Sequence, residues 1–178
     1  MSTSKVTEQI VKYPIGQEPN FVIPQDYQPY RFVLGKNGTN PLLAICMNPS
    51  AAREELSDRT VNIVIKTAEK FGYDGWIVVN LYPERATDSG NMDKFNEELH
   101  RKNMEVIANV IDEYHIEKLW GAWGNMPHKN LGRAKKDLMK LLQEKNIKIF
   151  HFGKLSKSGN PHHPLYLKIE ADSMYYFK

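Results

Sequence analysis

Two polar residues far apart in the sequence, Asn48 and His163, each come after a strand-like apolar run and each precede a proline. The two runs are residues 42–47 and 147–151. In an open α/β sheet the carboxyl ends of parallel strands share one edge, where ligands bind. An amide can hold a water molecule, and a neutral imidazole can donate a hydrogen bond to an oxyanion. If both runs are parallel strands of one sheet, Asn48 and His163 line one crevice.

Each of these residues also has a simpler interpretation. The side chain of Asn48 can merely cap an Asn-Pro turn. A metal site at His163 is disfavoured because the chain has no His-x3-His helix spacing and no partner cysteine. Asp58 precedes a helix-like segment, so it is an N-cap candidate as well as a candidate general base.

A third polar residue, Asn80, ends the β-branched run 76–79. Its amide offers two donors and one acceptor and can therefore read the edge of a nucleobase, or it can cap a turn. Tyr82 and Arg85 follow in a loop rich in side chains able to meet a ligand. Trp123 comes after another strand-like run and can stack on a base or pack in the core.

The apolar pattern between these residues predicts the elements that position them. Helical stripes alternate with short apolar runs, and a β-α-β-α-β-α-β order favours a mainly parallel four-stranded sheet inside a three-layer α-β-α sandwich. Two apolar runs, 30–34 and 42–47, bracket an Asn-Gly pair, which predicts a hairpin that adds an antiparallel N-terminal edge strand. The predicted helices are 60–71, 95–114 and 131–145, and the strands are 42–47, 76–79, 119–122 and 147–152.

The length of 178 residues suits one domain. Residues 1–28 are polar and rich in proline, which indicates an N-terminal arm followed by a single α/β domain over 29–178. Residues 164–178 show no periodic pattern, and we expect a loop and tail there.

The chain contains one cysteine, Cys46, inside an apolar run, which predicts a small buried side chain and excludes an internal disulfide. No apolar segment is long enough for a signal peptide core or a membrane span. We therefore expect a soluble, cytoplasmic protein with no membrane partner and no cofactor, and a monomer is favoured.

The net charge of +3 is unevenly distributed along the chain. Residues 128–168 carry ten Lys or Arg and only two Asp or Glu, whereas residues 1–127 are net acidic. Such a basic block is typical of a phosphate-facing surface. A solvated helix face with exposed lysines is the alternative interpretation.

The chain carries six short motifs in order: Asn48-Pro49-Ser50, Asp58-Arg59-Thr60, Val79-Asn80-Leu81-Tyr82, Ala86-Thr87-Asp88, Trp120-Gly121-Ala122-Trp123-Gly124 and His163-Pro164-Leu165-Tyr166-Leu167. Together they resemble the bacterial and phage family known as domain of unknown function 1643. The resemblance covers about residues 30–168. The family name implies no activity.

The chain more distantly resembles the uracil-DNA glycosylase superfamily. The matches are Asn48-Pro49 after the first core strand, Asn80 at the end of the second, Leu119-Trp120-Gly121 in the third and His163-Pro164 after the last. The family's usual Ser-Pro-Leu-Ser after the His-Pro is replaced by Leu165-Tyr166-Leu167. This resemblance implies a uracil-DNA glycosylase-like fold and a flipped nucleobase as the ligand.

The resemblance also implies roles for the candidate site residues. Asn48 would position the attacking water, Asn80 would bind the Watson–Crick edge of the base, and His163 would stabilise the departing base anion. Asp58 completes the catalytic candidates, and Tyr82 and Trp123 complete the base-binding candidates. The candidate DNA contacts are Ser50, Arg85, Lys129, Arg133 and Lys157, with Leu165 or Tyr166 as a wedge in the vacated stack.

Three functions are therefore open. The first is a DNA glycosylase-like enzyme acting on a damaged or modified base. The second is a non-catalytic module of the same fold that binds a nucleotide or nucleic acid. The third is a hydrolase of small nucleosides or nucleotides, which would not need a basic surface beside the crevice.

Overall fold

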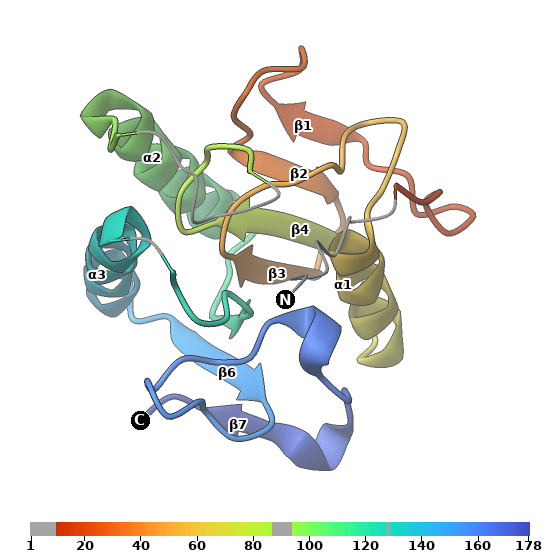
Figure 1. Cartoon of the computed structure of the whole chain (residues 1–178). Helices are drawn as coiled ribbons and strands as arrows, with labels where there is room; N and C mark the ends of the chain where they lie inside the picture. The colour runs from red at the N-terminus through yellow and green to blue at the C-terminus, as the bar shows by residue number, and fades with distance from the viewer. Residues whose placement is uncertain (1–9, 87–93, 128) are drawn as a thin grey trace, which may run out of the picture.

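The computed structural model describes residues 10–86, 94–127 and 129–178 (Figure 1). Short 3-10 helices η2 (Pro164–Tyr166) and η3 (Ala171–Ser173) follow the last helix. The strands are β1 (Phe21–Ile23), β2 (Val33–Lys36), β3 (Pro41–Cys46), β4 (Gly75–Asn80), β5 (Lys118–Gly121), β6 (Lys148–Phe152) and β7 (Met174–Tyr176). The helices are α1 (Arg59–Lys70), α2 (Glu97–Glu113) and α3 (Lys129–Glu144).

The seven strands found in the described residues form one mixed sheet in the order β1-β2-β4-β3-β5-β6-β7. The four central strands β4, β3, β5 and β6 are parallel, as the alternating pattern predicts. Strands β1, β2 and β7 add antiparallel pairs at the two sides of this core. The sheet is therefore larger than the four strands and one edge strand predicted from the sequence.

The predicted hairpin between residues 30–34 and 42–47 is wrong. Strand β2 pairs with β4 rather than with β3, through Leu34 opposite Val78. Strand β3 is buried along its whole length and has parallel partners on both sides, β4 and β5. No edge of β3 is left for β2, so β2 lies one strand further out.

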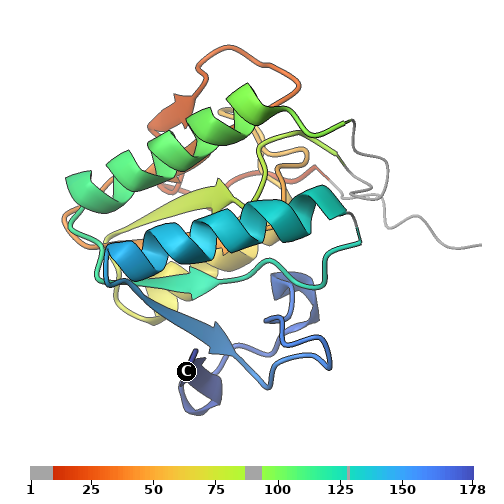
Figure 2. The same ribbon diagram turned by 90° about the vertical axis from the view of Figure 1, so that its left-hand side faces the viewer.

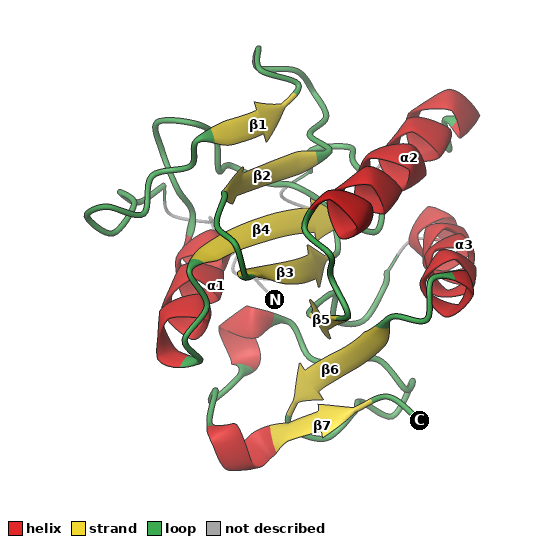
Figure 3. Ribbon diagram, turned by 180° about the vertical axis from the view of Figure 1, so that it is seen from behind, coloured by secondary structure: helices red, strands yellow, loops and turns green. Residues whose placement is uncertain are grey.

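The two faces of the sheet are covered by different helices. Figures 2 and 3 show α2 and α3 on one face and α1 on the other. Alternate residues of β3 face opposite sides: Leu43 and Ile45 pack in the cluster with α2 and α3, whereas Leu42 and Ala44 pack in the cluster with α1. Strands covered on both faces read as continuous apolar runs, which explains why they were recognisable in the sequence.

Local signals mark the starts of α1 and α2 and the end of α1. Asp58 accepts a hydrogen bond from the amide of Val61 and caps α1, and Asn96 caps α2 in the same way through Leu99. After α1, Gly72 adopts a φ of 76°, a conformation that glycine takes without strain. None of the helices in the described ranges is long and apolar enough to cross a membrane.

The ends of the chain contribute to the sheet. Phe21–Ile23 form β1 within the proline-rich N-terminal segment. Met174–Tyr176 form β7 antiparallel to β6, so the prediction of a loop and tail over 164–178 is wrong for these residues. Three residues are too few to show a period of two in the sequence, which explains the error.

The winding of the chain changes direction at the centre of the sheet. Strands β3 and β5 are neighbours, but α1 carries the chain from β3 to β4 over one face while α3 carries it from β5 to β6 over the other. The loops after β3 and β5 therefore diverge. In open α/β sheets this divergence leaves a crevice at the carboxyl ends of the strands.

Candidate functional site

A cavity lies at the carboxyl ends of β3 and β4, on the face of the sheet covered by α1. Five residues singled out in the sequence line it together: Asn48, Ser50, Asp58, Asn80 and His163. Its floor includes Cys46 and Val78, and the N-terminus of α1 forms one wall. Residues separated by more than a hundred positions in the chain thus meet at one site.

The amide of Asn80 is the most unusual group in this cavity. Asn80 is the last residue of β4, directly opposite Cys46 of β3, and its side chain is 0% exposed. Neither Nδ2 nor Oδ1 has a hydrogen-bond partner among the residues that the structure describes. A buried amide without partners costs about 1–3 kcal/mol, which favours a ligand that offers it both a donor and an acceptor.

Asn48 is held by its amide nitrogen. Nδ2 donates to the carbonyl oxygen of Ala86 at 2.8 Å and more weakly to those of Pro49 at 3.2 Å and Glu84 at 3.4 Å. Three carbonyl acceptors identify this atom as the nitrogen, so the other amide atom is an oxygen acceptor. Asn48 therefore both closes its turn and presents Oδ1 as an acceptor.

Asp58 is 2% exposed, and both its oxygens accept backbone hydrogen bonds. Oδ1 accepts from Val61 at 2.9 Å and Oδ2 from Ala52 at 3.1 Å. The N-cap interpretation of the sequence is confirmed. The same carboxylate lines the cavity, where its negative charge acts on His163.

His163 approaches from the loop after β6 and caps η2. The amide of Leu165 donates to its Nδ1 at 3.3 Å. Since Nδ1 is an acceptor, the proton of the neutral ring lies on Nε2. Gly124 adopts a φ of 72°, and a Cβ at that position would lie 3.2 Å from the Cβ of His163. The glycine after Trp123 therefore allows the histidine to pack closely against the end of β5.

Burial lowers the pKa of His163 below its usual value, and the charge of Asp58 opposes this shift. We expect the free energy of unfolding to fall as the pH is lowered below about 6.5, because the unfolded chain then takes up a proton that the native state resists. Burial also lowers the pKa of His151. Urea denaturation at several pH values between 5 and 8 gives the free energy of unfolding as a function of pH. This free energy should change less steeply with pH in His163→Gln than in the wild type, and least steeply in His151→Gln/His163→Gln. An equal dependence of the unfolding free energy on pH in the wild type and both variants would show that these two histidines do not cause it.

Two arginines hold the loop between β3 and α1 that carries Ser50. Arg31 is 2% exposed and donates from Nη1 to the carbonyl of Ala52 at 2.6 Å. Arg85, expected from the sequence to contact DNA, donates to the carbonyls of Ser50 at 2.7 Å and Gln28 at 3.0 Å. Burial, with Arg31 nearby, lowers the pKa of Arg85 to about 10. Both guanidinium groups therefore shape the wall of the cavity.

The two aromatic candidates for base binding lie in the core rather than along the cavity. Tyr82 is 1% exposed, stacks on Phe95 and accepts a hydrogen bond from the amide of Asn96. Trp123 is 0% exposed and donates from Nε1 to Asn160 at 3.2 Å. For Trp123 the structure agrees with the core interpretation. Thr87 and Asp88 of the neighbouring motif lie outside the described residues.

The basic candidates differ in their surroundings. Lys129 begins α3 and Lys157 follows β6, so both lie at the carboxyl edge of the sheet, and both are exposed. Arg133 forms an ion pair with Glu97 at 2.5 Å, which offsets its charge. Beside the cavity, Leu165 is half-buried, whereas Tyr166 is 78% exposed with its ring 6.1 Å from that of His163.

The cavity is small as the structure stands. It offers about 30 Å³ to the centres of water molecules, enough for one or two of them. A nucleobase fits only if one wall moves. Within the described part of the chain, no group of three or more His, Cys, Asp or Glu residues is arranged to hold a metal ion.

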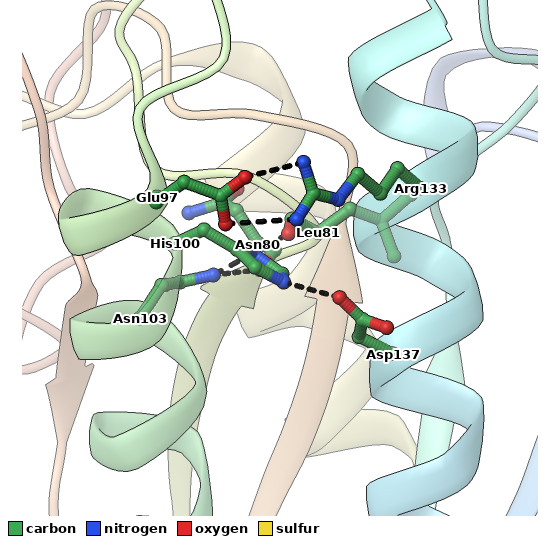
Figure 4. Close-up of polar contacts among 7 residues, drawn as sticks. All are labelled: Asn80, Leu81, Glu97, His100, Asn103, Arg133 and Asp137. Atoms are coloured by element: carbon green, nitrogen blue, oxygen red, sulfur yellow. Dashed lines mark hydrogen bonds and ion pairs between the residues drawn. The ribbon is translucent and has the colours of Figure 1, made fainter.

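Sequence reasoning missed two residues: Arg31, which lines the cavity, and Asn103, which holds the end of β4 without lining the cavity. Arg31 stands inside the apolar run 30–34, where a cation signals either an edge strand or a buried partner. Asn103 lies on the apolar stripe of α2, between Leu99 and Ile107, and is fully buried beneath the end of β4 (Figure 4). A polar residue on an apolar stripe is the signal that could have found it.

The fold and the cavity define an α/β protein with a polar cavity at the carboxyl edge of its parallel strands. The chain belongs to the DUF1643 family, described as proteins of unknown function, whose model matches residues 31–165. This confirms the resemblance drawn from the six motifs. No curated protein and no solved structure matches the chain.

Proposed function

We propose that this protein binds a nucleobase in the cavity and hydrolyses the N-glycosidic bond of a damaged or modified base in DNA. The observation that carries the proposal is the buried amide of Asn80, whose donor and acceptor both lack partners among the described residues. The Watson–Crick edges of nucleobases present donor and acceptor side by side. The order of the Asn-Pro, Asn, Trp-Gly and His-Pro motifs, which resembles that of the uracil-DNA glycosylases, supports the same ligand.

His163 supplies the group that the reaction needs most. Cleavage leaves an oxocarbenium-like sugar and an anionic base. A neutral imidazole that donates from Nε2 stabilises this anion without the cost of burying a positive charge. The lowered pKa of His163 keeps the ring neutral near pH 7. Removing one such donor costs about 10²- to 10³-fold in rate.

Asn48 and Asp58 act on the sugar side. Oδ1 of Asn48 would hold the attacking water as an acceptor, while the amide nitrogen is engaged by backbone carbonyls. The carboxylate of Asp58 keeps both oxygens on backbone amides, so its contribution is electrostatic: it stabilises positive charge nearby without taking a proton. The proton that the attacking water gives up would pass to the departing base anion, which would leave as the neutral base. The rate would then come chiefly from stabilising the leaving base rather than from activating the water.

The DNA would lie along the carboxyl edge of the sheet. Lys129 and Lys157 are exposed there and would neutralise phosphates, while the exposed ring of Tyr166 or the side chain of Leu165 would fill the vacated stack. The small cavity implies that the base enters as a wall opens, which favours bases already weakly paired.

The test uses duplex and single-stranded DNA carrying uracil, alkylated, oxidised or hypermodified bases. We expect abasic sites at one of these bases, detected by alkaline cleavage, and a loss of about 100-fold or more in His163→Ala. The matched control is His162→Ala, because His162 is adjacent in sequence but does not line the cavity. Equal losses in both variants would contradict the role of His163.

Two other outcomes identify the alternatives. Binding of a free base, with no abasic product from any DNA, would show a non-catalytic binding module. Cleavage of free nucleosides that is unaffected by Lys129→Glu/Lys157→Glu would show a nucleoside hydrolase, whereas loss of activity on DNA alone would support the DNA substrate. The control for charge reversal is Lys118→Glu/Lys148→Glu, because these exposed lysines pair at the opposite, amino edge of the sheet.

A further inference from the structure

We infer that Asn103 is a positioning residue for Asn80: from the opposite face of the sheet, it fixes the end of β4 so that the Asn80 amide points into the cavity. The inference rests on the proposed function for its ligand, a nucleobase. Asn103 does not line the cavity. Affinity for the base would therefore depend on a residue that the base never touches.

The peptide group between Asn80 and Leu81 is held from both sides. On one side the amide of Leu81 donates to the carbonyl of Cys46 in β3 at 2.9 Å. On the other side the carbonyl of Asn80 accepts from Nδ2 of Asn103 at 2.9 Å. The N–H and C=O of one peptide point in opposite directions, so these two bonds together fix the peptide plane and hence the backbone torsion at Asn80.

Asn103 replaces a missing strand partner. The carbonyl of Asn80 points away from β3, toward the side of β4 where β2 pairs. That pairing ends at Leu34 opposite Val78, two residues before Asn80. Without Asn103 this buried carbonyl would lack a partner among the described residues, and the end of β4 would be free to twist.

This control of the backbone matters because the Asn80 side chain has no protein partner of its own among the described residues. A side chain held by hydrogen bonds keeps its direction even if its backbone shifts slightly. The Asn80 amide has no such hydrogen bonds, but packing around the fully buried side chain limits its rotamers, so its direction follows the backbone at residue 80. Pre-organised polar groups bind more tightly because less ordering is required on binding.

Helix α2 is itself anchored to α3, which lies beside it on the same face of the sheet (Figures 2 and 3). Figure 4 shows two polar links from α2 to α3, both made by residues that precede Asn103 along α2. His100 contacts Oδ2 of Asp137 through Nε2 at 2.8 Å, and Arg133 pairs with Glu97. Asn103, three residues after His100, thus projects from a helix whose position is fixed by a second helix.

The test compares Asn103→Leu, which removes the donor at similar volume, with Ile107→Val, a matched buried change one turn further along α2. Hydrogen exchange of the Leu81 amide is measured without ligand, and dissociation constants for uracil, cytosine and adenine are measured by NMR titration. We expect Asn103→Leu to speed Leu81 exchange about tenfold more than the control and to weaken base binding about 3- to 30-fold. If Asn103→Leu does not fold, Asn103→Ala replaces it in both measurements.

Two results would overturn the inference: Leu81 exchange equal to that of Ile107→Val, or base affinity equal to that of the wild type. A wild type that binds none of the three bases would instead count against the proposed function. In that case the exchange rates still decide whether Asn103 holds the end of β4. The two failures are therefore distinguishable.

Discussion

Replacing Asn80 by leucine is expected to raise the free energy of unfolding by about 1–3 kcal/mol while weakening base binding about 100-fold. The substitution removes a fully buried amide that has no partner among the described residues and adds apolar atoms beside Val78 and Cys46. The protein would gain stability by losing the group that we propose recognises the base. Urea denaturation and titration with free nucleobases measure the two effects.

The control for this prediction is Asn103→Leu. Asn103 is equally buried, but its amide nitrogen is bonded to the carbonyl of Asn80, so the same change of chemistry should destabilise the protein. If the free energy of unfolding rises in Asn80→Leu and falls in Asn103→Leu, the two buried asparagines have different roles, recognition for Asn80 and structure for Asn103. If Asn80→Leu also destabilises the fold and leaves base binding intact, Asn80 is not the recognition group.

Asp58→Ala is expected to lower the free energy of unfolding by roughly 2–4 kcal/mol, the sum of a lost helix cap and an unsatisfied buried amide. One carboxylate oxygen caps α1 through Val61, and the other holds Ala52 in the preceding loop. Its loss also removes negative charge near the buried guanidinium of Arg85, which Asp58 stabilises. Thermal and urea denaturation measure the change.

Asp58→Asn is the matched variant, because it keeps an oxygen for the cap but turns an amide nitrogen toward one backbone donor. We expect an intermediate loss of stability. A change below about 1 kcal/mol for Asp58→Ala would mean that the loop and helix hold their positions without this carboxylate.

Long periodic elements were predictable from the sequence, and short pairings were not. The apolar stripes of α1, α2 and α3 and the continuous runs of β3 to β6 gave the correct alternation, because buried faces impose a period. Strands β1 and β7 have three residues each and impose none. The partner of β2 was mispredicted because an Asn-Gly pair signals a turn but cannot reveal that both edges of β3 are already occupied.

The candidate site was also predictable in part. Asn48, Asn80 and His163 meet because strand order places their strand ends at one edge, which topology makes predictable. The environment of each loop residue was not predictable. Arg85 and Tyr82 have the side chains of ligand contacts, but the first is held by backbone carbonyls and the second packs on Phe95. Both roles depend on which segments fold beside them.

Strand β7 has a consequence for the segment that carries His163. The chain leaves β6 at Phe152 and returns at Met174, and these two residues lie opposite each other in the sheet. The intervening loop is thus closed at its base, and under the proposed function the imidazole near its middle would act as a reagent tethered at two points. Opening one tether would lower the effective molarity of the imidazole at the cavity with every cavity residue unchanged.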